Sequence, residues 1–173
     1  LFAGGYQALL VNTSGSNNTA IGYQSMNKNM TGFENTAVGH QALFSLVTGF
    51  TNTAVGHQSL YTNTGSDNTA LGYRSLYLNT SGGSNTALGQ STMYNNTTGT
   101  FNVATGKAAM YSNTTGSNNT AAGYNAMTSN TTGASNTVMG YNALRLNLIG
   151  NFNVALGDSA LQATTGSNLT AVG

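Results

Sequence analysis

Short apolar groups alternate with small polar residues along the chain at a fixed period. The phrase Asn-Thr-Ala-aliphatic-Gly recurs, and a small residue and then Leu or Met follow three and four residues after its closing glycine. The closing glycines recur with a 17-residue period, apart from two 16-residue intervals. This periodicity indicates a repeat array. The closing glycines are Gly5, Gly22, Gly39, Gly56, Gly72, Gly89, Gly106, Gly123, Gly140, Gly157 and Gly173.

A second glycine lies seven residues before each later closing glycine, without exception from Gly15 to Gly166. Both 16-residue units lose their residue between the closing glycine and this second glycine. One half of the unit therefore has a fixed length. The other half contains a loop, usually Asn-Thr-Thr-Gly, that tolerates a deletion.

Each position in the unit has its own residue type when positions are counted from the closing glycine as zero. Position −4 is Asn in nine successive units, from Asn18 to Asn153. Position −3 is usually Thr, position −2 is Ala apart from Val138, and position −1 is mostly aliphatic. Position +3 is always small, position +4 is always Leu or Met, and position +5 is often aromatic.

These apolar groups lack helical spacing, and a glycine recurs in each half of the unit, which would break helices. Short segments bounded by glycine turns indicate β-strands. The sequence predicts an all-β fold: a β-solenoid, or β-roll, of about ten 17-residue coils with two short strands per coil. Stacking at about 4.8 Å per coil would make a rod on the order of 48 Å long.

The small residues at positions −2 and +3 predict a narrow interior. The Asn at position −4 predicts a ladder of side-chain amides, in which each amide donates to one neighbouring coil and accepts from the other. The sequence contains no Pro, which could not donate to such a ladder.

Two aliphatic sets occur in each unit, at positions −1 and +4, and a glycine turn separates them. One narrow interior could hold both, or one set could face a neighbouring chain. The Leu or Met at +4, followed by a ring at +5, is large for a narrow lumen. We therefore expect this stripe to face outward and to mark an oligomer interface.

Composition excludes several classes of protein. Charged residues are 4% of the chain, the net charge is +1, and the four basic residues are scattered, so no nucleic-acid footprint is present. No apolar run approaches the length of a membrane span. The chain has no Cys for disulfides or thiolate metal sites. We expect residues 1–173 to be a single repeat array and a fragment of a longer fibrous protein.

The phrase Asn-Thr-Ala-Val-Gly-x-x-Ser/Ala resembles the YadA-like head repeats of trimeric autotransporter adhesins. Matching phrases include Thr19-Ala20-Ile21-Gly22 and Val154-Ala155-Leu156-Gly157. The whole chain also resembles phage-type tail-fibre repeat arrays, as in Gly123-Tyr124-Asn125-Ala126-Met127 with its Asn-Thr-Thr-Gly loop. The resemblance implies a homotrimeric extracellular fibre. The 17-residue unit is longer than the usual head repeat, which implies a larger second turn.

Few residues are candidates for chemistry. His40 and His57 share position +1 in adjacent units, where Tyr is usual, and no carboxylate or third His accompanies them. We interpret both as flat polar substitutes for Tyr and not as metal ligands. Glu34 and Asp67 lie two coils apart and Asp158 is far along the rod, so we interpret all three as solvated surface residues. The sequence predicts no catalytic, cofactor or metal site.

Two further features bear on binding. Asn-x-Ser/Thr sequons recur, mostly in the loop half, and could accept glycans in a suitable host; examples are Asn12, Asn17, Asn29, Asn79, Asn96, Asn113, Asn130 and Asn168. The Thr file at position −3 resembles the flat arrays of ice-binding solenoids. Because Val103 and Val154 replace Thr in this file, we expect it to face inward.

The leading prediction is a non-catalytic extracellular fibre shaft or adhesin head at a cell surface or on a virion, serving surface attachment or recognition of a host glycan or receptor. Its expected partners are two further copies in a homotrimer, or other copies in a fibrous assembly. One alternative is a monomeric solenoid that binds ice or carbohydrate through a flat Thr/Asn face. Another is a subunit of a filament polymerised end to end.

Overall fold

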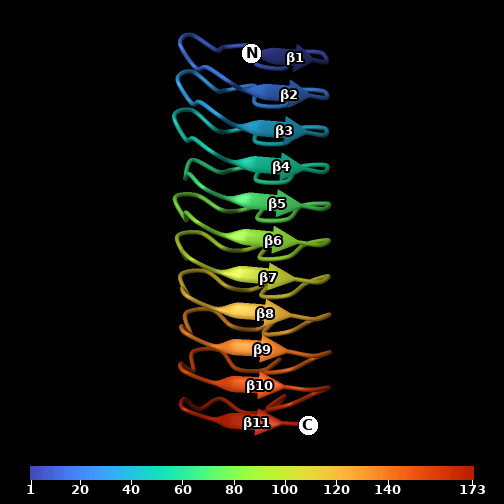
Figure 1. Cartoon of the computed structure of the whole chain (residues 1–173), viewed down its shortest axis with the longest axis vertical. Helices are drawn as coiled ribbons and strands as arrows, with labels where there is room; N and C mark the ends of the chain where they lie inside the picture. Colours follow the sequence, from blue (N-terminus) through green and yellow to red (C-terminus); the bar gives the residue numbers. More distant parts are fainter.

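The computed structural model describes all 173 residues as one straight stack of coils with the termini at opposite ends (Figure 1). Each coil contributes one three-residue strand. The strands are β1 (Phe2–Gly4), β2 (Thr19–Ile21), β3 (Thr36–Val38), β4 (Thr53–Val55), β5 (Thr69–Leu71), β6 (Thr86–Leu88), β7 (Val103–Thr105), β8 (Thr120–Ala122), β9 (Thr137–Met139), β10 (Val154–Leu156) and β11 (Thr170–Val172).

The strands form a single parallel sheet in sequence order, so each coil pairs only with its two neighbours. Equivalent positions are in register, as for Ala20 and Ala37. The 16-residue unit between Gly56 and Gly72 keeps this register, with Thr53 opposite Thr69. The missing residue is therefore absorbed in the turn. The β-solenoid and the predicted length of its coils are confirmed.

The prediction of a second strand in each coil is wrong. The segment after the closing glycine forms a turn. Its residues at positions +2 and +4 adopt left-handed backbone conformations, as in Ala108 (φ 57°) and Met110 (φ 51°). Position −5 is also left-handed in every coil, as in Asn118 (φ 60°). An extended strand cannot contain such residues, although the turn still hydrogen-bonds to the next coil, with Met26 N donating to Ala42 O at 2.9 Å.

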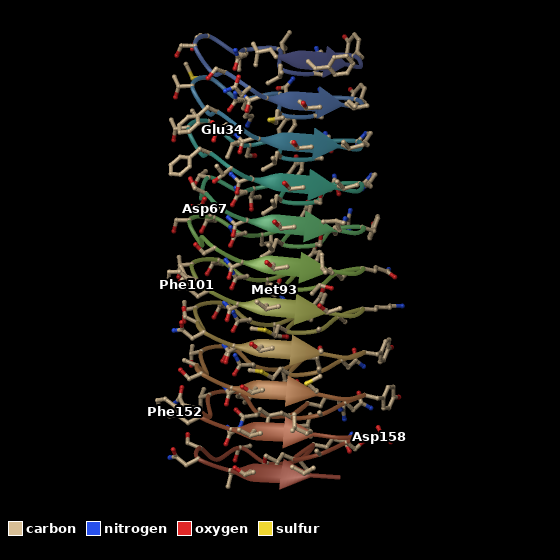
Figure 2. All side chains as sticks on the ribbon, in the orientation of Figure 1. Glu34, Asp67, Met93, Phe101, Phe152 and Asp158 are labelled. Atoms are coloured by element: carbon tan, nitrogen blue, oxygen red, sulfur yellow. The ribbon has the colours of Figure 1, made fainter.

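The interior is closed by a wall of small residues on each side and filled by the Leu or Met of position +4. The Ala residues at −2, the small residues at +3 and the large residues at +4 are almost all fully buried. Met93, for example, lies in the body of the stack and is 0% exposed (Figure 2). The prediction that the +4 stripe faces outward is therefore wrong. Its left-handed backbone directs each large side chain into the lumen.

The predicted Asn ladder at position −4 is confirmed. Asn102 Nδ2 donates to Asn85 Oδ1 at 3.2 Å and to the Gly116 carbonyl at 2.9 Å. Asn102 Oδ1 accepts from the backbone N–H and the side-chain amide of Asn119. Every polar atom of the buried amide therefore has a partner, and the chain of amides ties each coil to the next.

A second buried amide ladder lies in the segment predicted to be a loop. The Asn at position +7 donates to the equivalent Asn of the preceding coil, as from Asn96 Nδ2 to Asn79 Oδ1 at 2.7 Å. Leu46 interrupts this ladder, and Asn29 Oδ1 is buried without a partner beside the interruption. The recurrent Asn of the Asn-Thr-Thr-Gly phrase was the sequence signal for this ladder.

Glycine is required where adjacent coils approach closely. A Cβ at Gly116 would lie 2.4 Å from the Gly133 carbonyl oxygen and 2.4 Å from Asn113 Oδ1. The closing glycines are similarly crowded and also have positive φ, as in Gly123 (φ 139°). The two glycines of each unit are thus dictated by contact between coils.

Candidate functional site

The outward face of the sheet is the most regular surface of the rod. In each strand the −2 residue points inward, so its neighbours at −3 and −1 point outward. The prediction that the Thr file faces inward is wrong: from β2 to β10 the central residue of each strand, Ala or Val138, is buried, and the residues on either side of it are exposed or half-buried. We call the two files at −3 and −1, together, the sheet face.

The −1 file of the sheet face carries exposed aliphatic side chains through most of the rod. Ile21 is 40% exposed, Leu71 41% and Met139 52%. These residues stack at the spacing of the parallel strands, so they form an aliphatic stripe along the rod. Thr105 and Ala122 interrupt the aliphatic character in adjacent coils.

The threonines of the sheet face have hydroxyl groups without partners in the chain. Every threonine hydroxyl that donates a side-chain hydrogen bond lies at another position. The contrast is clearest at position +8, where Thr97 Oγ1 donates to Thr114 O at 3.0 Å. The hydroxyls at −3 are therefore available to an external ligand.

The sheet face has no charged residue. All seven charged side chains lie at other positions: Lys28, Glu34, Asp67, Arg74, Lys107, Arg145 and Asp158. An uncharged surface of methyl, aliphatic and hydroxyl groups suits a flat, uncharged partner.

The three carboxylates, which the sequence predicted to be solvated, lie on the two edges of the rod. Glu34 and Asp67 are exposed on the edge formed by position −5, and Asp158 lies on the opposite edge, formed by position +1 (Figure 2). We call these the −5 edge and the +1 edge. Glu34 and Asp67 belong to coils that are not adjacent, with Thr51 between them. Thr51 Oγ1 donates to Asp67 Oδ1.

His40 and His57 belong to a file of stacked rings on the +1 edge. Their ring centroids are 4.8 Å apart, and the file continues to Tyr23 on one side and Tyr73 on the other. No group of three or more potential metal-ligating side chains occurs in the chain. The structure thus places both histidines as the sequence suggested, as flat rings in a tyrosine file.

Two more files run beside these rings, and neither was evident as a stacked file from the sequence. At position +2, Gln24 Nε2 donates to Gln7 Oε1 at 2.7 Å, and the series continues to Arg74, whose Nε donates to Gln58 Oε1 at 2.9 Å. At position +5, half-buried rings stack with centroids 5.0 to 5.2 Å apart. The members of this +5 file are Phe44, Tyr61, Tyr77, Tyr94 and Tyr111.

The rod has no detected cavity, and none of its segments is a helix of the length and apolarity needed to cross a membrane. The chain was also compared with known proteins. It matches no protein-family model, no curated protein and no solved structure. The fold and surface therefore define its class: an all-β repeat solenoid with an uncharged sheet face.

Proposed function

We propose that this chain is a non-catalytic shaft of an extracellular fibre, and that three copies associate side by side through the sheet face. The observation that supports this proposal best is the exposed aliphatic file at position −1. A stripe of this length loses unfavourable contact with water when another rod covers it. The sequence resemblance to trimeric adhesin heads and tail-fibre arrays points to the same assembly.

The coil stack suits a shaft. Each coil contacts only its neighbours, so repeats can be added without changing the cross-section. The two internal amide ladders satisfy most of the buried side-chain amides along the stack. Such a rod holds a binding tip away from a cell or virion surface, where it serves attachment to a host glycan or receptor.

The mass of the folded chain in solution tests this proposal. We expect a discrete species of three times the 17.7 kDa chain. Leu71→Lys, which places a charge in the −1 file, is expected to give monomers. Gln90→Lys, at the position that Lys107 occupies in the next coil, leaves the trimer intact. A monomeric wild-type chain at micromolar concentration contradicts the proposal, and growth that continues with concentration favours end-to-end filaments instead.

A second candidate function is favoured by the unpaired hydroxyls at position −3. A monomer could present these hydroxyls and the adjoining methyl groups to the ordered water lattice of ice. Asn cannot take part, because the −4 amides are buried in their ladder. The combined variant Thr53→Val, Thr69→Val and Thr86→Val keeps the shape of the face. If the chain binds ice, the wild type shows thermal hysteresis and this variant does not. If the chain forms the proposed trimer, the variant remains trimeric.

A further inference from the structure

The structure divides the Asn-x-Ser/Thr sequons into groups with opposite environments. Ten sequons occur in the chain. Five of them begin at a fully buried Asn of the +7 ladder: Asn29, Asn79, Asn96, Asn113 and Asn130. Three begin at position −5, at Asn17, Asn118 and Asn168, where the side chains are exposed. The remaining two begin at Asn12 and Asn95.

The buried sequons cannot accept a substituent in the folded rod. Asn96 is 0% exposed, and its Nδ2 donates to Asn79 Oδ1 at 2.7 Å and to the Gly99 carbonyl at 3.1 Å. A sugar on this nitrogen would remove a donor and would have no space between the walls. The five buried sequons are thus structural amides and not acceptors for glycans.

The three −5 sequons present both of their recognition groups to solvent. The amides of Asn17, Asn118 and Asn168 are absent from the side-chain hydrogen bonds that tie the coils together, and their backbone is left-handed, at φ 55°, 60° and 60°. The sequon Thr falls at position −3 of the sheet face, where the hydroxyl is unpaired. In the sequons that begin at Asn17 and Asn118, the middle residue is a buried Asn of the −4 ladder. The Asn and the Thr on either side of it therefore point away from the core.

The two remaining sequons lack this combination. Asn12 is half-buried and its Nδ2 donates to the Gly15 carbonyl at 3.1 Å, while its Oδ1 accepts from Asn29. In the sequon of Asn95, the hydroxyl of Thr97 donates to Thr114 O. Only the −5 sequons have a free amide together with a free hydroxyl.

We propose that Asn17, Asn118 and Asn168 are sites of N-linked glycosylation, which places sugars along the −5 edge of the rod. The donor is a nucleotide-activated hexose. A bond forms between Asn Nδ2 and the anomeric carbon, the bond from that carbon to the diphosphate oxygen breaks, and the nucleoside diphosphate leaves while the amide loses one proton. Because the sequon threonines lie on the sheet face that the proposed trimer covers, the inference concerns the folded chain with this face uncovered. Sugars on this edge would hydrate a rod with only 4% charged residues.

The test uses the folded Leu71→Lys variant, whose sheet face stays uncovered, with a soluble asparagine glycosyltransferase and nucleotide-activated glucose, followed by peptide mapping. We expect hexoses at Asn17, Asn118 and Asn168 and none on the +7 ladder. The urea-unfolded chain, diluted into the same reaction before refolding, should gain hexoses at both groups of sequons. Modification of the +7 ladder in the folded chain overturns the proposal. So does the absence of modification at −5 when the unfolded chain is modified there.

Two variants keep the test independent of folding. Thr120→Val removes the sequon hydroxyl and places at −3 a residue that Val103 and Val154 already supply, so Asn118 should lose its hexose while Asn17 keeps one. Ser84→Asn completes a sequon with Thr86 at an exposed −5 position, and position 84 should gain a hexose. Modification of Asn118 in the first variant, or an unmodified position 84 in the second, contradicts the proposal.

Discussion

Asn35 donates two hydrogen bonds to the side chain of Asn18 in the preceding coil. Its backbone N–H lies 2.9 Å from Asn18 Oδ1, and its side-chain Nδ2 lies 3.2 Å from the same oxygen. One buried carbonyl oxygen thus satisfies both a backbone donor and a side-chain donor. Because the pair recurs along the stack, the ladder at position −4 fixes the spacing of the coils as well as satisfying their polar groups.

Replacing Asn102 by Ala tests this ladder in the middle of the rod. The change leaves the buried backbone N–H of Asn119 without its partner, whereas the Gly116 carbonyl still accepts a hydrogen bond from Asn113 Nδ2. A buried unsatisfied group costs roughly 1–3 kcal/mol, so we expect the free energy of unfolding to fall by about 2 kcal/mol. Urea titration measures the loss. Asn95→Ala, at a half-buried side chain outside the ladders, is the matched control and should change stability by less than about 0.5 kcal/mol.

Leu46→Asn should be tolerated although Leu46 is fully buried. An amide at this position can donate to the unpaired Asn29 Oδ1 and continue the +7 ladder to Asn63. We expect the free energy of unfolding to change by less than about 1 kcal/mol, because the new amide gains hydrogen-bond partners while the apolar contacts of Leu46 are lost. Leu43→Asn, in the same coil at position +4, places an amide where no ladder offers hydrogen-bond partners. We expect its free energy of unfolding to fall by about 4 kcal/mol. Equal losses in the two variants would disprove the account.

Ala108→Gly and Ala109→Gly should have opposite effects. Ala108 has a left-handed backbone (φ 57°), which is disfavoured by roughly 1–2 kcal/mol for a residue with a Cβ. Glycine removes this penalty, so we expect a gain of about 1 kcal/mol in stability. Ala109 is buried at position +3 outside the left-handed region, and glycine there should destabilise by about 1 kcal/mol. Urea midpoints of the two variants on either side of wild type would bear this out.

Gly116→Ala tests whether close approach, and not backbone conformation, requires the second glycine. The new Cβ would lie 2.4 Å from the Gly133 carbonyl, so adjacent coils must separate, and we expect a loss of about 3 kcal/mol. Gly166→Ala is the control, because its Cβ would meet only Leu169, with Cδ1 at 3.4 Å. Thermal unfolding should show a lower midpoint for the first variant only. A wild-type midpoint for Gly116→Ala would rule out the crowding described.

The candidate site could be predicted only in part. The Thr and aliphatic files were evident from residues such as Thr69 and Leu71, but their direction was not. A three-residue strand is too short for an alternating pattern to identify its buried side, and Val103 in the Thr file suggested the wrong one. The +4 stripe was misplaced for a related reason, since a residue such as Met110 is rarely expected in a left-handed conformation.

The sequence by itself determined the period, the in-register stacking of coils, the narrow interior and the amide ladder at −4. These features follow from identical residues recurring at fixed spacing, because neighbouring coils must place like beside like. Only the tertiary structure decided which side chains fill the lumen and which sequons remain accessible. Those outcomes depend on the left-handed residues of each coil, which direct Met93 inward and Asn118 outward. They also depend on how little space the narrow lumen leaves beside the buried side chains.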